Sequence, residues 1–359
     1  MVRFRHYFRL FSHIQLMPVL EAGEETLVGG QAVMEGVMMR APHSYCVAVR
    51  RANGDIVTEE AMLPKVSEKY PIFKLPFFRG IGTLGQAMHL GMKALQFSAN
   101  IALEDEEAKP KEPVVKPWWQ FWMVSTLGIS TAAPVSGGGS GQKESALSST
   151  MMWIQVAFSV GFFIALYKFL PLMLTDWATK QYPAFENRFL FNALDGVIRI
   201  ALFLGVMFGM SRMKDIHRVF EFHGAEHKVV FNFEARQPVT VQNAQSFVTW
   251  HPRCGTSFLL VVMLVSMLTY MVLPPVQSFL GKFLIRVGMI LPVAGISYEI
   301  IRLAARKRGS WLAFLTAPGL WLQRITTQPP DDQAVEVAIH ALNGAMLLEE
   351  KQGGELVIA

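Results

Sequence analysis

Four long apolar stretches dominate the second half of the chain, at residues 151–174, 189–210, 256–273 and 283–301. Each is long enough to cross the hydrocarbon core of a bilayer as one helix, which takes about 20 residues. A single stretch of this kind would suit a buried core helix equally well, but four in succession are typical of a membrane protein. The pattern therefore predicts a polytopic α-helical membrane protein with about four transmembrane helices.

Few charges interrupt these stretches. Asp195 and Arg199 in the second lie four residues apart on one helical face, where each lowers the cost of burying the other. Residues 118–135 are apolar but rich in Ser and Thr, and we do not count them as a span. Residues 311–325 are broken by Pro318-Gly319, which favours an interfacial or re-entrant segment.

A small α+β domain is predicted ahead of the apolar stretches, over residues 27–103. Residues 45–50 are rich in β-forming side chains, Asn53-Gly54 is typical of a tight turn, and residues 56–59 suit the returning strand. Residues 80–102 are apolar with few helix breakers, which predicts a helix.

The remaining segments differ in composition. We expect a basic N-terminal extension at 1–26, the α+β domain at 27–103, a polar linker at 104–150, the membrane domain at 151–304 and a C-terminal region at 305–359. The extension suits a helix on the membrane surface, a solvated helix or a disordered segment. In the C-terminal region an amphipathic helix is expected to begin at Asp331 or Asp332, with an apolar stripe of Val335, Ile339, Leu342 and Met346.

Basic residues predict the orientation of the chain. Among the segments that flank the apolar stretches, the connection between the second and third (residues 211–255) and the segment after the fourth are the more basic. They carry Arg212, Lys214, Arg218, Lys228, Arg236, Arg253, Arg302, Arg306, Lys307 and Arg308. The opposite side offers Lys180, Arg188 and Lys282. The positive-inside rule therefore predicts a multi-pass protein of the inner (plasma) membrane, with both termini, the N-terminal domain and the 211–255 loop in the cytoplasm.

Composition agrees with this class and excludes others. Hydrophobic residues make up 52% of the chain and charged residues 17%, and the formal net charge is only +5. A charge this small does not indicate nucleic-acid binding, so the expected partners are the lipid bilayer and an unidentified membrane or cytoplasmic protein. Two cysteines are too few for a disulfide framework.

The most distinctive chemistry lies in the 211–255 loop. His223, Glu226 and His227 have the His-x-x-Glu-His order of a class of zinc-dependent proteases. On a helix the two imidazoles are one turn apart and can bind one ion, while Glu226 is placed to act as a general base on water. The alternative is a polar helix whose histidines contact lipid headgroups or carboxylates.

A second group of donors follows at His251-Pro-Arg-Cys254. Pro252 favours an extended conformation at His251, and Gly255-Thr-Ser suits the start of the next helix. Cys254 is therefore expected at a helix N-terminus, which favours its thiolate form. A buried structural cysteine is the alternative. Glu299 near the inner end of the fourth stretch should lie at the same depth, as a neighbour or alternative ligand of the site, unless it pairs with Arg302.

Six motifs carry a resemblance to a known family. They are GGQAVMEGVMMR at 29–40, PFFRG at 76–80, HGAEHK at 223–228, HPRCGTSF at 251–258, GISYE at 295–299 and PGLWLQ at 318–323. Together they resemble the YqhQ-like family of uncharacterised membrane proteins, which are described as predicted metal-dependent enzymes. The resemblance covers roughly residues 27–340. It implies a cytoplasmic-side metal site at His223, Glu226, His227, His251 and Cys254.

The glycine-rich stretch at 29–40 lacks the spacing of a phosphate-binding loop. Gly29, Gly30 and Gly36 allow close backbone approach, so we interpret the stretch as a structural turn. Glu35 and Arg40 within it are expected to pair with each other or to face a ligand.

Three functional hypotheses remain from sequence. If His223, His227, His251 and Cys254 all bind one divalent metal, most simply zinc, the site is closed and structural, and the protein is an assembly or scaffold factor. If only three bind, a position stays open and Glu226 serves a metal-dependent hydrolase as general base. A membrane scaffold without metal is the third hypothesis. The hydrolase is the leading one.

Overall fold

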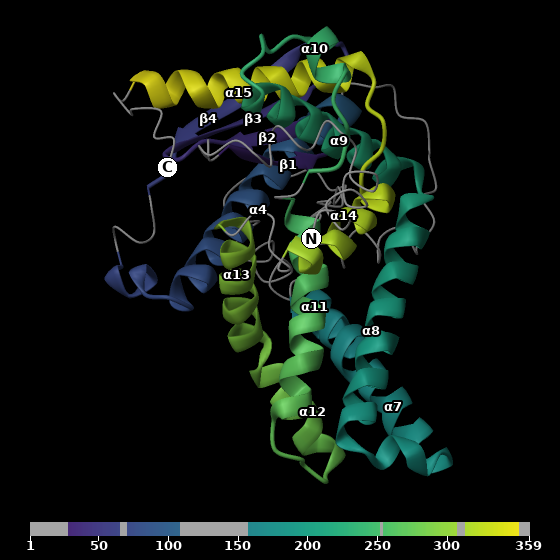
Figure 1. The fold of residues 1–359 in the computed structure, drawn as a ribbon. Helices are drawn as coiled ribbons and strands as arrows, with labels where there is room; N and C mark the ends of the chain where they lie inside the picture. Colours follow the sequence, from purple (N-terminus) through teal and green to yellow (C-terminus); the bar gives the residue numbers. More distant parts are fainter. Residues whose placement is uncertain (1–27, 65–69, 108–156, 252–253, 307–312, 352–359) are drawn as a thin grey trace, which may run out of the picture. The chain divides into compact units, whose positions relative to one another are not determined.

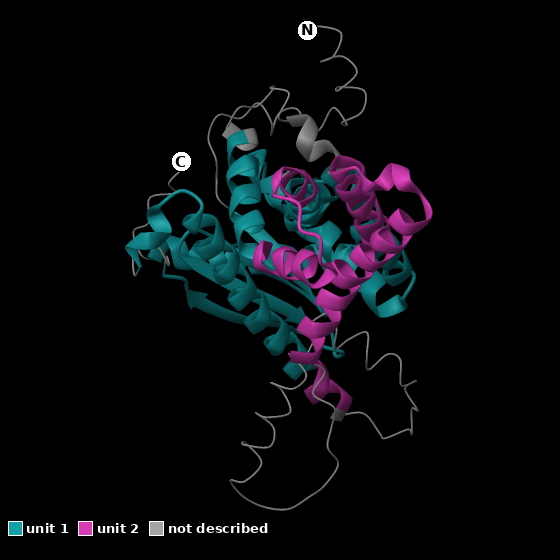
Figure 2. Ribbon diagram, turned by 90° about the horizontal axis from the view of Figure 1, so that it is seen from below, with its two compact units in different colours: residues 1–101, 204–265, 291–359 teal, residues 102–203, 266–290 magenta. Residues whose placement is uncertain are grey.

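The computed structural model describes residues 28–64, 70–107, 157–251, 254–306 and 313–351 (Figure 1). The chain divides into two compact units, each drawn in its own colour in Figure 2. Unit 1 comprises Met1–Ile101, Leu204–Val265 and Leu291–Ala359, and unit 2 comprises Ala102–Phe203 and Ser266–Ile290. The predicted N-terminal extension and most of the predicted linker lie outside the described residues.

A four-stranded antiparallel sheet forms the centre of unit 1. Its strands follow chain order: β1 (Gly29–Val33), β2 (Gly36–Arg40), β3 (Ser44–Arg50) and β4 (Ile56–Met62). The predicted hairpin of β3 and β4 is confirmed, and Gly54 in its turn has a φ of +96°. Residues 29–40, which we interpreted as a turn, form a second hairpin around Glu35, itself at a φ of +48°.

Both faces of this sheet are buried. Cys46 and Ala48 of β3 contact one apolar cluster, while Tyr45, Val47 and Val49 contact the other. The first face is covered by α9 (Lys214–Glu234) and α15 (Asp332–Lys351), and the second by α4 (Phe78–Glu107) (Figure 1). Alternate residues of β3 therefore enter different cores, which explains why its sequence is nearly all apolar.

Unit 1 has further helical elements outside the sheet and the three helices that cover it. They are η1 (Pro71–Lys74), α10 (Val241–Gln245), α13 (Ile290–Arg306) and α14 (Ala313–Thr326). The predicted amphipathic helix near the C-terminus is α15, and the buried side chains Val335 and Leu342 belong to its predicted stripe. Asp331 caps it by accepting a hydrogen bond from the Ala334 N–H at 2.7 Å.

The regular secondary structure in the described residues of unit 2 is helical. It contains η2 (Ala165–Phe169, a π-helical segment), α7 (Leu170–Gln181), η3 (Pro183–Glu186) and α12 (Phe279–Gly288). The boundary between the units falls within α8 (Arg188–Ser211) and within α11 (Gly255–Val272).

Among the described residues, three helices are long and apolar enough to cross a membrane: Ala157–Gln181, which includes η2 and α7, Arg188–Ser211 and Gly255–Val272. They correspond to the first three predicted spans. The predicted fourth span is a pair of helices, Phe279–Gly288 and Ile290–Leu303, that meet at 47°. Pro292 explains the break, because a proline without an N–H is accepted in the first turn of α13 but not inside one continuous helix.

Close packing of α15 on the sheet yields a stability prediction. A Cβ at Gly344 would lie 2.6 Å from Cys46 Sγ and 2.8 Å from Glu60 Oε1. We expect Gly344→Ala to lower the free energy of unfolding by up to about 2 kcal/mol, because overpacking costs about 1–3 kcal/mol and alanine's higher helix propensity returns about 1. Thermal unfolding of the purified protein measures this loss.

Gly29→Ala is the matched control, since no atom lies within 4 Å of a Cβ built at Gly29. It should unfold close to the wild-type temperature. Equal unfolding temperatures for Gly344→Ala and wild type would contradict the close contact between α15 and β3.

Candidate metal centre

Helix α9 carries the His-x-x-Glu-His motif through the interior of unit 1. Its residues 224–232 are buried, including Glu226 (6% exposed) and His227 (2% exposed). Ala225, Val229 and Val230 on the same helix belong to the apolar core beneath the sheet. Packing therefore holds the helix in place and keeps its polar side chains from water. His223 and His227 lie one turn apart on this helix, as their spacing predicted.

Backbone carbonyls orient both imidazoles. Nδ1 of His223 lies 2.8 Å from the carbonyl oxygen of Thr326, and Nδ1 of His227 donates to the carbonyl oxygen of Thr249. A carbonyl oxygen only accepts, so each Nδ1 carries the proton and each Nε2 retains its lone pair. Burial lowers the pKa of both rings and keeps them neutral. Metal-binding histidines are commonly oriented in this way.

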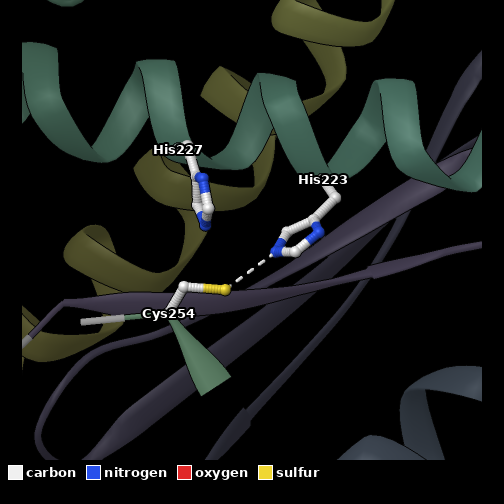
Figure 3. A group of neighbouring side chains, drawn as sticks. All are labelled: His223, His227 and Cys254. Atoms are coloured by element: carbon white, nitrogen blue, oxygen red, sulfur yellow. Dashed lines mark hydrogen bonds between the residues drawn. The ribbon is translucent and has the colours of Figure 1, made fainter. Parts of the chain in front are cut away.

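Cys254 faces the two lone pairs. His223 Nε2 lies 3.2 Å from Cys254 Sγ, and the ligand atoms of His223, His227 and Cys254 all lie within 4.8 Å of one another (Figure 3). The peptide N–H of Cys254 donates to the His251 carbonyl at 3.3 Å. The Thr256 N–H approaches the sulfur at 3.5 Å, as expected where α11 begins.

These three donors suit a divalent metal. Two imidazole nitrogens and one sulfur are ligands that zinc accepts. His227 Nε2 is buried and has no hydrogen-bond partner among the described residues, although it lies 3.4 Å from Glu226 Oε2. A buried polar atom without a partner is unfavourable, and a metal ion at this position would satisfy it.

Glu226 is held against the first strand of the sheet. A Cβ at Gly30 would lie 2.6 Å from Glu226 Cγ, so only glycine fits there, and the Gly30 N–H donates to the Glu226 carboxylate. Burial raises the pKa of Glu226, because removal from water disfavours its charged form. A carboxylate with a raised pKa beside a group of metal ligands is typical of a general base.

His251, the fourth predicted donor, points to a different partner. Its Nε2 lies 3.3 Å from Glu234 Oε2, and its ring centroid is 5.7 Å from that of His227. Burial lowers the pKa of His251 to about 4. The structure thus brings His223, His227 and Cys254 together and leaves His251 beside them.

Comparison with known proteins agrees with the motifs. Residues 75–347 match a family model described as "Protein of unknown function (DUF1385)". The chain belongs to this family. It is 34% identical over 329 residues to "Uncharacterized protein YqhQ" of Bacillus subtilis (strain 168), which covers 89% of this chain and 92% of the relative. The resemblance to the YqhQ-like family is thereby confirmed. No solved structure matches the chain.

The remaining candidate site residues of this DUF1385 chain contact side chains other than those of His223, His227 and Cys254. Glu299 accepts hydrogen bonds from Arg79 Nε at 2.7 Å and from the Phe77 N–H at 3.1 Å, so its ion-pair partner is Arg79. Glu35 lies 3.3 Å from Arg218 Nε, and Arg40 contacts Gln86 at 3.5 Å. Glu35 and Arg40 thus contact different residues.

Two supporting residues were not foreseen. The Gln323 amide accepts from the His251 N–H and donates to the His251 carbonyl, both at 2.7 Å, and it also donates to Ser257 Oγ at 2.8 Å. Lys228 donates to the carbonyls of Gln245 and Phe247. Both side chains hold the loop that carries His251 and Cys254. Each occurs in a motif quoted above, but nothing in the sequence indicates what it contacts.

The two cysteines should differ sharply in reactivity. Cys46 is fully buried and burial raises its pKa to about 12, so at pH 8 on the order of one thiol in 10⁴ is ionised. Cys254 is only partly buried. In native, metal-free protein we expect iodoacetamide to modify Cys254 and leave Cys46 unmodified, whereas both react after unfolding; mass spectrometry of peptides measures this.

Cys254→Ser serves as the control, and its native form should incorporate no label. Modification of Cys46 in the native protein at the rate of Cys254 would show that α15 does not cover the sheet as described.

Proposed function

We propose that this chain is a multi-pass membrane protein with a metal-dependent hydrolase site at the cytoplasmic surface. Three helices with the length and apolar character of membrane spans, and the bent pair α12–α13, support the first part. The excess of basic residues in residues 211–255 and after residue 301 supports the cytoplasmic placement of both termini and of the site.

The convergence of three donors is the observation that carries the enzymatic proposal. His223, His227 and Cys254 would hold a divalent metal, most simply zinc. Three protein ligands leave a coordination position open, which is the usual arrangement in catalytic zinc sites, while structural sites take four. A metal bound there supplies a Lewis acid that polarises the bond to be cleaved and activates water.

Glu226 is the proposed general base. Its carboxylate lies next to His227, and its raised pKa suits a group that accepts a proton from water and passes it to a leaving group. Gly30 fixes the carboxylate from one side. The same carboxylate therefore both accepts and donates the proton, with no other titratable group needed.

A structural metal site is the second candidate. His251 is near the three donors, and rotation of its ring away from Glu234 would supply a fourth. In that case the protein would be a non-enzymatic assembly or scaffold factor that holds an unidentified membrane or cytoplasmic protein. The extensive loop contacts of Gln323 and Lys228 favour a rigid site of this kind.

Metal analysis separates these alternatives. Detergent-purified wild-type protein should contain about one equivalent of zinc. His227→Ala and Cys254→Ser should each weaken binding at least about 100-fold, because each removes a ligand. Inductively coupled plasma mass spectrometry and competition with a chelator measure content and affinity.

His217→Ala is the matched control, because His217 lies on the same helix and its side chain is 47% exposed; it should retain zinc. His251→Ala should also retain zinc if three donors bind, and its loss of zinc would favour the closed structural site. A wild type without stoichiometric metal would remove both metal proposals and leave the metal-free scaffold.

Glu226→Gln tests the general base. We expect this variant to retain zinc and its unfolding temperature but to lose hydrolytic turnover by about 10²–10⁴-fold, the usual contribution of a general base. Turnover is measured as metal-dependent cleavage of amphiphilic ester, amide and phosphoester substrates. Unchanged turnover by the zinc-loaded variant would contradict the role of Glu226.

A further inference from the structure

Among its described residues, unit 2 buries more positive than negative charge. The side chains of Arg199 and Arg286 are buried with one carboxylate, Asp195. Arg199 forms an ion pair with Asp195 Oδ2, and Arg286 Nη2 lies 3.5 Å from the same oxygen. Two guanidinium groups, neither of which loses its proton in a protein, therefore share a single negative charge.

A third cation lies beside them. Lys168 Nζ donates to the Tyr270 hydroxyl at 3.3 Å. All three cations surround the Tyr270 ring, with Lys168 Nζ, Arg199 Cζ and Arg286 Cζ at 5.7, 5.4 and 5.0 Å from its centroid. We call Lys168, Arg199 and Arg286 the cation cluster; with Asp195 its formal charge is +2.

The described neighbours of the cluster do not compensate for this excess of positive charge. Asp176 is already bound by Lys282 at 3.0 Å and by Lys180 at 3.6 Å. The other contacts of the two arginines are neutral, with Ser266 Oγ at 2.7 Å from Arg199 Nη1 and Asn192 Oδ1 at 3.1 Å from Arg286 Nη2. Surplus charge among apolar helices is unfavourable, so an anion from outside the chain would stabilise the cluster.

The hydrogen bonding of the cluster is also incomplete. Among the described residues, Nε of Arg199, Nε of Arg286 and Oδ1 of Asp195 are buried without a partner. Partly satisfied polar networks are unstable in a low-dielectric interior, and they are found where a ligand or function requires them.

Lys168 is the accessible member of the cluster. It is half-buried, and it lies in the π-helical segment η2, a rare helix form that occurs mostly at functional sites. Phe163 and Phe169, on the same helix, are exposed. A ligand with a charged head and an apolar body can therefore place its charge at Lys168 and its apolar part along these rings.

We infer that the cation cluster of unit 2 binds a phosphate group, carried by an anionic lipid or present as free phosphate. Phosphate offers more acceptor oxygens than a carboxylate, which suits three cations that converge from separate helices. The cluster involves none of the residues of the metal centre, so this inference stands or fails independently of the proposed hydrolase.

Binding can be measured on the full chain in a non-ionic maltoside detergent at about 0.15 M salt, which screens weak surface attraction. The probes are short-chain phosphatidate, diacylglycerol with the same acyl chains, and inorganic phosphate; the readout is the rise in unfolding temperature with probe concentration. We expect phosphatidate to stabilise the wild type. Lys168→Gln should weaken its apparent affinity about tenfold, as for loss of one charge-assisted contact.

Lys180→Gln is the matched control, because it removes the same charge from the same helix at a side chain that is 73% exposed. It should weaken binding less than about twofold. Lys168→Arg should retain binding. If Lys168→Gln does not fold, Lys168→Met carries the same test.

The probes also identify the source of the phosphate. Stabilisation by phosphatidate but not by inorganic phosphate indicates a lipid, and equal stabilisation by both indicates free phosphate. The inference is wrong if neither stabilises the wild type, if diacylglycerol acts as strongly as phosphatidate, or if Lys168→Gln and Lys180→Gln weaken binding equally.

Discussion

The fold of unit 1 depends on the hydrogen bonds that its buried polar side chains require. Helix α9 places His227, Lys228 and Asn232 in the interior, and each donates a hydrogen bond to a backbone carbonyl. Those carbonyls belong to residues 237–249, so the loop after α9 folds back along the helix to supply them. Its path brings His251 and Cys254 beside the two imidazoles, and the group of candidate ligands is a consequence of that path.

The sheet does not form a separate N-terminal domain, because it packs against helices from the middle and the end of the chain. Its first strand contacts Glu226 through Gly30, and its third strand is covered by α15 from the other end of the chain. The first, middle and last parts of the sequence therefore share one core. Glu299 and Arg79, which are 220 residues apart, join two of these parts by an ion pair.

Local patterns were sufficient for several features of the fold and the site. The Asn53-Gly54 hairpin, the apolar stripe of α15 and the pairing of Asp195 with Arg199 all follow from short spacings, and the structure confirms them. The β1–β2 hairpin was missed because its strands are rich in glycine and are buried by partners distant in sequence. The contact of His251 was missed for a similar reason. The sequence shows four possible metal ligands close together, but the contact of His251 with Glu234 depends on how the loop is folded.

The hydrogen bond between His223 and the Thr326 carbonyl has a consequence for the synthesis of the protein. The carbonyl that sets the tautomer of His223 belongs to Thr326, which is synthesised 103 residues later. A nascent chain cannot complete the centre before then. A truncated product that ends before α14 would therefore carry all three candidate ligands, with His227 still oriented by Thr249 but His223 without its orienting carbonyl.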